Sequence, residues 1–246
     1  MSELAFDYSI RSELPSRPES PAQLGSRFVN TLDALTHVDS TVFVNWEVMD
    51  YPARASSPLP KARERIGAII EKNVYRNDLG EACPQFGYTA GALVISDDKS
   101  RRVSLRIKTG GTKKGETSLQ TGAWDVFPDA ATVTYPVFKT ALLAIGANWP
   151  PHWACAYAFR VGYDKESLVA GAPLFPYSLF HITWIAYLPA PLAAGLELPP
   201  EICTEHTSDG GVLISATKER LDPADPEHLR RARILAEVMI ERTGQT

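Results

Sequence analysis

The sequence predicts an α+β fold: a mixed, mainly antiparallel sheet with about four to five helices packed on it. Its 246 residues are 44% hydrophobic and 22% charged, which is typical of a globular chain with a sizeable core. Segments with helical and strand periodicity alternate along the chain, and three central strands follow one another through short turns. Such a meander is antiparallel, so helices mixed with it indicate the α+β class.

The first elements are a strand and a helix. Leu4, Phe6 and Tyr8 share one face at period two. Ser20 is a good N-cap, because Pro21 occupies the first helical position and Gln23 stands where a capping box needs it. The apolar stripe of the helix that follows is formed by Leu24, Phe28, Leu32 and Leu35.

The next region runs from a strand to the meander. Residues 41–49 are β-branched and aromatic, which predicts a strand. A loop over 51–60 and a helix over 61–75 come next, the helix with Ile66, Ile69, Ile70 and Val74 inward. The strands of the meander are expected at 86–95, 101–108 and 118–127.

The second half begins with a helix over 136–148, stopped by Trp149-Pro150-Pro151. Buried strands are expected at 153–161, 179–188 and 211–217. Asp225 caps the last helix, whose apolar stripe is formed by Leu229, Ala232, Leu235, Val238 and Met239. The expected core includes Phe28, Leu32, Trp46, Phe138, Leu142, Trp184, Leu235 and Val238.

We expect a single domain over residues 1–246. An alternative division has two loosely similar halves, 1–150 and 151–246. Each half has a strand with a Trp-containing apolar run and a helix opened by proline. This similarity between the halves is too weak to be called a sequence repeat.

The chain shows no sign of membrane insertion or export. Its longest mostly apolar stretch, 172–198, is broken by four prolines, whereas a spanning helix needs about 20 apolar residues. The N-terminus carries acids early and lacks the apolar core of a signal peptide. Three scattered cysteines do not make a disulfide framework. The expected location is therefore the cytoplasm, with no membrane contact.

Charge is distributed unevenly along the chain. Residues 51–118 hold 13 basic and 7 acidic side chains, whereas the segments before and after have net negative charge. The basic middle could indicate a nucleic-acid surface, but aromatic residues do not alternate with its charges, so no direct nucleic-acid binding is expected.

An acidic segment is the predicted partner-binding region. No Lys or Arg occurs between Lys165 and Lys218. Four acids in this stretch recur every four residues: Glu197, Glu201, Glu205 and Asp209. Helical spacing would align them, although Pro199 and Pro200 argue against a continuous helix. They form either a solvated face or a contact surface for a basic protein, with Asp97 and Asp98 in a hairpin turn as the next candidates.

Motifs for chemistry are weak. The glycines and lysines of 110–116 fit a hairpin turn better than a phosphate loop, because a strand is expected to follow. Cys203 and His206 lack the second ligand pair of a zinc site. Asp209-Gly210-Gly211 indicates a turn, and His181 a core histidine in a strand. The sequence thus predicts no catalytic residue, cofactor or metal.

Several segments in order resemble the bacterial immunity protein 52 family. They cover 27–46 (RFVNTLDALTHVDSTVFVNW), 134–154 (TYPVFKTALLAIGANWPPHWA), 181–200 (HITWIAYLPAPLAAGLELPP) and 209–239, the last with an Asp-Gly-Gly turn and an Asp-Pro-x-His helix start. Positions that match the family and look structural are Trp46, Tyr135, Trp149, Gly210, Gly211 and His228.

This resemblance implies an inhibitor rather than an enzyme. Members protect producing cells from polymorphic toxins with a restriction-endonuclease-like nuclease domain, commonly delivered by a type VI secretion system. The implied partner is a cognate nuclease-type toxin, whose basic cleft would favour an acidic inhibitor. Two other classes stay open: a small cytoplasmic hydrolase with an unrecognised site, and a nucleic-acid-binding module that uses the basic middle.

Overall fold

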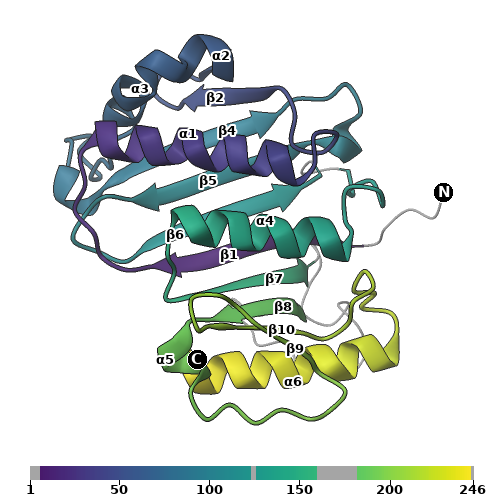
Figure 1. Cartoon of the computed structure of the whole chain (residues 1–246). Coiled ribbons are helices and arrows are strands. Elements are labelled where there is room, and N and C mark those ends of the chain that lie inside the picture. The colour runs from purple at the N-terminus through teal and green to yellow at the C-terminus, as the bar shows by residue number, and fades with distance from the viewer. Residues whose placement is uncertain (1–5, 123–125, 160–181, 245–246) are drawn as a thin grey trace.

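The computed structural model describes residues 6–122, 126–159 and 182–244, and these form one twisted sheet with helices on it (Figure 1). The ten strands of this part are ordered β3-β2-β4-β5-β6-β1-β7-β8-β10-β9, and every neighbouring pair is antiparallel. The predicted α+β class with a mainly antiparallel sheet is confirmed.

The first half of the chain builds one end of the sheet. Its strands are β1 (Asp7–Leu14), β2 (Trp46–Asp50), β3 (Ala55–Pro58), β4 (Tyr88–Val94), β5 (Val103–Thr109) and β6 (Gly115–Thr121). Its helices are α1 (Pro21–Val38), α2 (Leu59–Ala62) and α3 (Ile66–Lys72), with short 3₁₀ turns at Arg63–Arg65, Pro84–Phe86 and Lys99–Arg101. The predicted capping box starts α1, since Ser20 and Gln23 bond reciprocally.

The second half extends the same sheet. It contains α4 (Tyr135–Asn148), β7 (Trp153–Phe159), β8 (Ile182–Leu188), α5 (Ala190–Ala193), β9 (Cys203–His206), β10 (Val212–Ser215) and α6 (Pro226–Thr243). Helices α3, α1 and α4 lie side by side over one face, and α6 runs along β8 (Figure 1). Every residue of β8 is buried, so both faces of this strand are covered.

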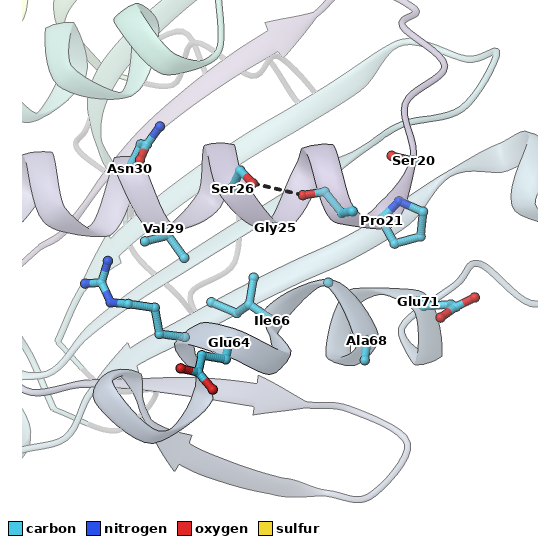
Figure 2. A pocket seen from close by; sticks show the side chains of 13 residues that line it. Ser20, Pro21, Gly25, Ser26, Val29, Asn30, Glu64, Ile66, Ala68 and Glu71 are labelled. Atoms are coloured by element: carbon cyan, nitrogen blue, oxygen red, sulfur yellow. Dashed lines mark hydrogen bonds between the residues drawn. The ribbon is translucent and has the colours of Figure 1, made fainter.

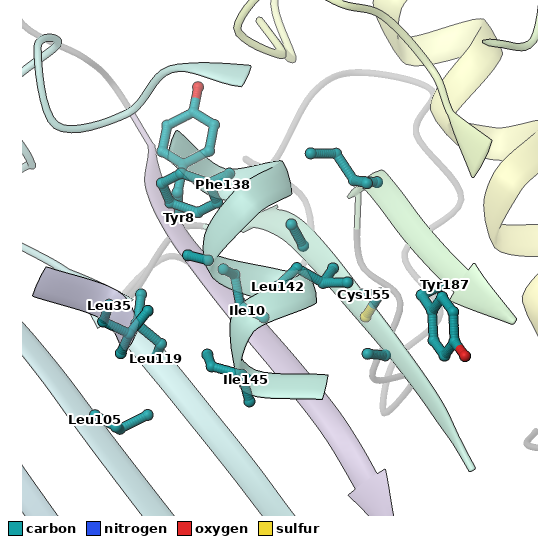
Figure 3. Packing of buried hydrophobic residues seen from close by; sticks show 14 of the residues in the cluster. Tyr8, Ile10, Leu35, Leu105, Leu119, Phe138, Leu142, Ile145, Cys155 and Tyr187 are labelled. Carbon is teal, nitrogen blue, oxygen red and sulfur yellow. The ribbon is translucent and has the colours of Figure 1, made fainter. Parts of the chain in front are cut away.

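Strand β1 lies in the middle of the sheet. It pairs with β6 on one side and with β7 on the other, although β7 is almost 150 residues away in the sequence. Tyr8 and Ile10 of β1 lie beneath α4, against Phe138, Leu142 and Ile145 (Figure 3). The core therefore contains residues from both halves of the chain.

A bulge in β8 brings Trp184 into this core. Ala156 pairs with Ile185 and Tyr157 pairs with Thr183, so Trp184 is the extra residue between the two pairs. Its ring lies 5.3 Å from that of Phe138 and 5.9 Å from that of Tyr8, and its indole N–H donates to the carbonyl of Thr217. The bulge thus turns a large aromatic side chain toward α4.

Seven of the eight expected core residues are fully buried: Phe28, Leu32, Trp46, Phe138, Leu142, Trp184 and Leu235. Val238 is only partly buried, and Ala236 of the same helix takes its place against the core. The apolar stripe of α6 is therefore rotated slightly from the predicted one.

The predicted strand 41–49 is wrong over its first half. The Asp39 carboxylate accepts bonds from the backbone N–H groups of Thr41 and Val42, which closes a turn, and Asn45 has a positive φ. The strand therefore begins at Trp46. Residues 51–60, predicted as a loop, include the edge strand β3, where Pro58 is tolerated because an edge needs fewer donors.

The helix predicted over 61–75 is broken into α2, a 3₁₀ turn and α3, and it ends at Lys72. Asn73 explains this end, because its side chain accepts from the N–H of Tyr51 and donates to the carbonyl of Met49. In the predicted strands 118–127, 153–161 and 179–188, residues 123–125, 160–161 and 179–181 lie outside the described part, as do Leu4 and His181. Strand β9 was not predicted.

Candidate functional site

A groove runs between α4 and the hairpin of β9 and β10. Its volume is about 710 Å³. Its mainly apolar floor and walls include Leu142, Leu143, Gly146, Pro150, Pro151, Tyr187, Pro189 and Leu213. Its polar rim is formed by Lys139, Glu205, His206, Thr207, Ser208 and Asp209. The groove therefore combines apolar surface with a few polar groups, as binding sites do.

Helix α4 forms one wall. The residues of this wall share a face of the helix beside its buried stripe, because they are spaced by four, three and one positions. They are Lys139, Leu143, Gly146 and Ala147. Gly146 leaves a gap in this face. A Cβ there would meet only the Pro151 Cδ, at 3.9 Å.

The opposite wall ends in the turn that joins β9 to β10. Gly210 has a φ of +82°, which glycine adopts without strain, and Asp209 precedes it at the tip. At Gly211 a Cβ would lie 2.8 Å from the Tyr187 ring, so glycine lets the turn approach β8 closely. The Asp-Gly-Gly segment is thus a turn, as expected, and it fixes Asp209 beside Tyr187.

The Asp209 carboxylate is held by three neutral donors. Oδ2 accepts from the Tyr187 hydroxyl at 2.6 Å, and Oδ1 accepts from the Thr207 hydroxyl and from the Gly211 N–H at 3.1 Å. The bonds from Thr207 and Tyr187 lower the pKa of Asp209, while burial and the bond to this carboxylate raise the pKa of Tyr187. At neutral pH Asp209 is therefore ionised and Tyr187 is neutral, and the proton between them stays on the Tyr187 hydroxyl.

Glu205 lies on the same rim but its charge is neutralised. It forms an ion pair with Lys139 of α4, accepts a bond of 3.3 Å from the Tyr135 hydroxyl, and lies 3.9 Å from the Lys218 ammonium. The bond from Lys139 lowers the pKa of Glu205. Glu205 thus fastens β9 to α4.

The other predicted contact acids lie apart from the groove. Glu201 precedes β9 and pairs with Arg230 of α6 at 3.0 Å, and Glu197 is exposed in the loop after α5. Asp97 and Asp98 are exposed in the turn between β4 and β5, where Asp98 accepts from the N–H of Ser100. The spacing of four residues therefore does not create one acidic face, because the segment is loop, strand and turn rather than helix. Of the six acids, Glu205 and Asp209 line the groove.

A second hollow, of about 770 Å³, lies between α1 and α3 (Figure 2). Here the two helices approach closely, since a Cβ at Gly25 would lie 2.6 Å from the Ile66 Cγ2 and one at Gly67 3.2 Å from the Ala22 Cα. Ser26 in its wall bonds to the carbonyl of its own helix at Ala22. Helix packing accounts for these small residues, so we assign no ligand to this hollow.

The basic middle of the chain does bring cations next to aromatic rings, which the sequence did not suggest. The ammonium of Lys113 lies 4.3 Å from the centre of the Phe86 ring, and Phe86 packs edge-on against Tyr75. However, Lys114 pairs with Glu13, and Lys108 pairs with Glu116. Much of the basic charge in this area is therefore balanced locally.

Sequence reasoning missed Tyr187 and Gly146. Tyr187 is 22 residues from Asp209, and no local pattern connects the two. Gly146 carried a signal, because an interior helical glycine is unfavourable by about 1 kcal/mol and often has a packing or functional reason.

The described residues hold no group of three or more His, Cys, Asp or Glu side chains placed to bind a metal. Cys203 and His206 are three apart on β9, so their side chains point to opposite faces. Within the same part of the chain, no helix has the length and apolar character needed to traverse a bilayer.

Comparison with known proteins gave one family. The family model described as Immunity protein 52 matches residues 121–244, which is just over half of the chain and contains the whole groove. No curated protein matches the sequence.

One similar solved structure is the T6SS protein PA0821 of Pseudomonas aeruginosa. Its TM-score is 0.54 at 15% sequence identity, and the alignment covers 95% of this chain and 72% of that one. At this identity the likeness shows the fold alone.

Proposed function

The chain belongs to the immunity protein 52 family, and from this premise we propose that it binds a cognate nuclease-type toxin one-to-one and so neutralises it. The toxin is one delivered between bacteria by a type VI secretion system. The family match over residues 121–244 is the observation that carries the proposal. The shared fold with a protein whose name includes T6SS agrees with this mode of delivery.

The inhibition is stoichiometric rather than catalytic. A tight complex stops a nuclease without consuming anything, and it needs only a complementary surface on the inhibitor. DNA is the substrate of such a toxin, so protection is required in the cytoplasm of the producing cell. We propose that the protein neither contacts a membrane nor binds nucleic acid directly.

The acids expected from the sequence enter the proposal with different roles. Glu205 and Asp209 lie at the groove, and the exposed Glu197 would attract a basic surface at longer range. Glu201 already pairs with Arg230, so its contribution to the field is reduced. Asp97 and Asp98, in the turn between β4 and β5, form a separate candidate surface.

The test needs a toxin domain, and the first place to look for one is the reading frame next to the gene for this protein. The toxin domain is expressed in cells with and without this chain, and the purified domain is then titrated with it while cleavage of plasmid DNA is followed. We expect survival only in the presence of this chain, and loss of cleavage that is complete at one equivalent.

Two outcomes contradict the proposal. Cells that die although the protein is well expressed would remove the immunity function. Protection by a sub-stoichiometric amount, growing with time, would instead show that this chain acts as an enzyme on the toxin or its product.

A further inference from the structure

We infer that the groove between α4 and the β9–β10 hairpin seats an apolar segment of the toxin that carries one Lys or Arg side chain, whose charged group pairs with Asp209. The inference rests on the proposed function and specifies the surface and the chemistry of the partner. Its basis is the shape of the groove, the hydrogen bonds that fix the Asp209 carboxylate, and the charge of the rim.

The groove has room for side chains of a partner. Its volume of about 710 Å³ falls within the range of about 300–1,000 Å³ that is usual for binding pockets. Leu143 is only partly buried and faces this space with Leu213 on the opposite wall. Because Gly146 has no side chain, the wall is open where α4 passes Pro151. Apolar side chains placed there would be removed from water on both sides.

Asp209 supplies an ionised group that is already held in place. Its carboxylate has about four acceptor positions, and the three bonds from Thr207, Tyr187 and Gly211 use three of them. Two of these bonds end on Oδ1 and one on Oδ2, so the remaining acceptor position is on Oδ2. A partner that bonds to it does not have to immobilise a flexible side chain first.

The charge of Asp209 is not balanced by any cation of the described residues. Among the described residues, the ion pairs include none with Asp209, whereas Glu205 on the same rim pairs with Lys139. Among the residues that line the groove, the positive charge of Lys139 is used by Glu205, and Lys218 outside the lining also lies closest to Glu205, so the charge of Asp209 is left over. Covering this carboxylate with apolar groups alone would be costly, so the occupant must bring a cation.

The groove lies wholly inside the segment that defines the family. Its lining residues run from Lys139 to Leu213, and the family match runs from 121 to 244. The hollow between α1 and α3 lies outside that match. Of these two hollows, the groove is thus the one that the family match covers.

Two substitutions test the inference in the full-length protein, with the neighbouring toxin domain as the binding partner. Asp209→Asn removes the charge and keeps a side chain that can bond within the turn. Gly146→Leu fills the groove from a position where α4 gains helix propensity. Asp97→Asn is the charge-matched control at the β4–β5 turn, and Gly146→Ala is the control that adds only a methyl group.

We expect dissociation constants measured by calorimetry to separate the variants. Asp209→Asn weakens binding by about 10- to 100-fold, the value of a hydrogen bond to a charged group. Gly146→Leu weakens it by about 30-fold or more, as loss of a binding hot spot does. Asp97→Asn changes binding by at most about twofold. Melting temperatures that stay at or above the wild-type value for both Gly146 variants would show that the fold is intact.

The outcomes separate this inference from the proposed function. Wild-type protein that fails to bind or protect overturns the proposed function and the inference together. Normal wild-type binding with unchanged affinity in Asp209→Asn or in Gly146→Leu overturns the inference alone. If Gly146→Leu instead converts a dimer of this chain to a monomer, the groove holds a second copy, and the inference is wrong.

Discussion

The hydroxyl of Tyr187 donates a hydrogen bond of 2.6 Å to the carboxylate of Asp209, which joins β8 to the tip of the β9–β10 hairpin. We predict that Tyr187→Phe raises the pKa of Asp209, because this bond stabilises the ionised form. NMR titration of the carboxyl carbon measures the change. Asp33 of α1 serves as the control, because its pKa is lowered by the bond from Arg63 and should not change. An unchanged Asp209 titration would show that Thr207 and Gly211 alone hold the carboxylate.

The same substitution at two helical glycines should have opposite effects. Gly25→Ala places a methyl group 2.6 Å from the Ile66 Cγ2 and 3.0 Å from a backbone nitrogen of α3, so it forces the helices apart and destabilises the fold by about 1–3 kcal/mol. Gly146→Ala meets no atom closer than 3.9 Å and should stabilise the fold by about 0.5–1 kcal/mol. Urea unfolding of both variants checks this. Two changes of equal sign would contradict the packing described for α1 and α3.

Leu142→Ala should destabilise the fold by about 2–5 kcal/mol. Leu142 belongs to α4, is 1% exposed and points from the helix toward residues of β1 and β7 (Figure 3). Leu143→Ala, next to it on the groove side, removes the same atoms from a half-buried site and is the control with a smaller expected loss. Chemical denaturation gives both values. Equal losses would mean that the two positions do not differ in packing.

The ion pair of Glu205 predicts a pH-dependent contribution to stability. Its pKa in the folded state lies below the ordinary value of 4.5, chiefly because Lys139 donates to it, with Tyr135 and Lys218 also nearby. The contribution is therefore present above about pH 4.5 and is lost as the pH falls through the folded-state pKa. Glu205→Gln should be less stable than the wild type at pH 7, with a smaller difference at pH 3. A difference that does not depend on pH would assign the effect to lost packing.

The helix starts could be predicted because their signals are local. Ser20 and Gln23 bond to each other across one turn, and Asp225 accepts from the N–H groups of Glu227 and His228. Strand 41–49 was wrong at its start because β propensity does not reveal that the Asp39 side chain captures the next backbone amides.

The candidate site could be predicted only in part, because its contacts join distant segments. The acids at 205 and 209 were found from composition, yet the partners that distinguish them are Lys139 and Tyr187. Lys139 neutralises the charge of Glu205, whereas the neutral Tyr187 hydroxyl leaves Asp209 with its charge. No pattern within β9 contains that difference, since Lys139 is 66 residues from Glu205.

The central place of β1 also has a consequence for synthesis and for truncation. The edge of β1 that pairs with β7 has no partner until residues 153–159 have left the ribosome, so the second half of the sheet cannot assemble early in translation. A fragment restricted to 121–244 would leave that edge of β7 open to pairing between molecules and is expected to aggregate. We therefore expect that the segment matched by the family model does not fold by itself, and that a shortened protein must retain β1.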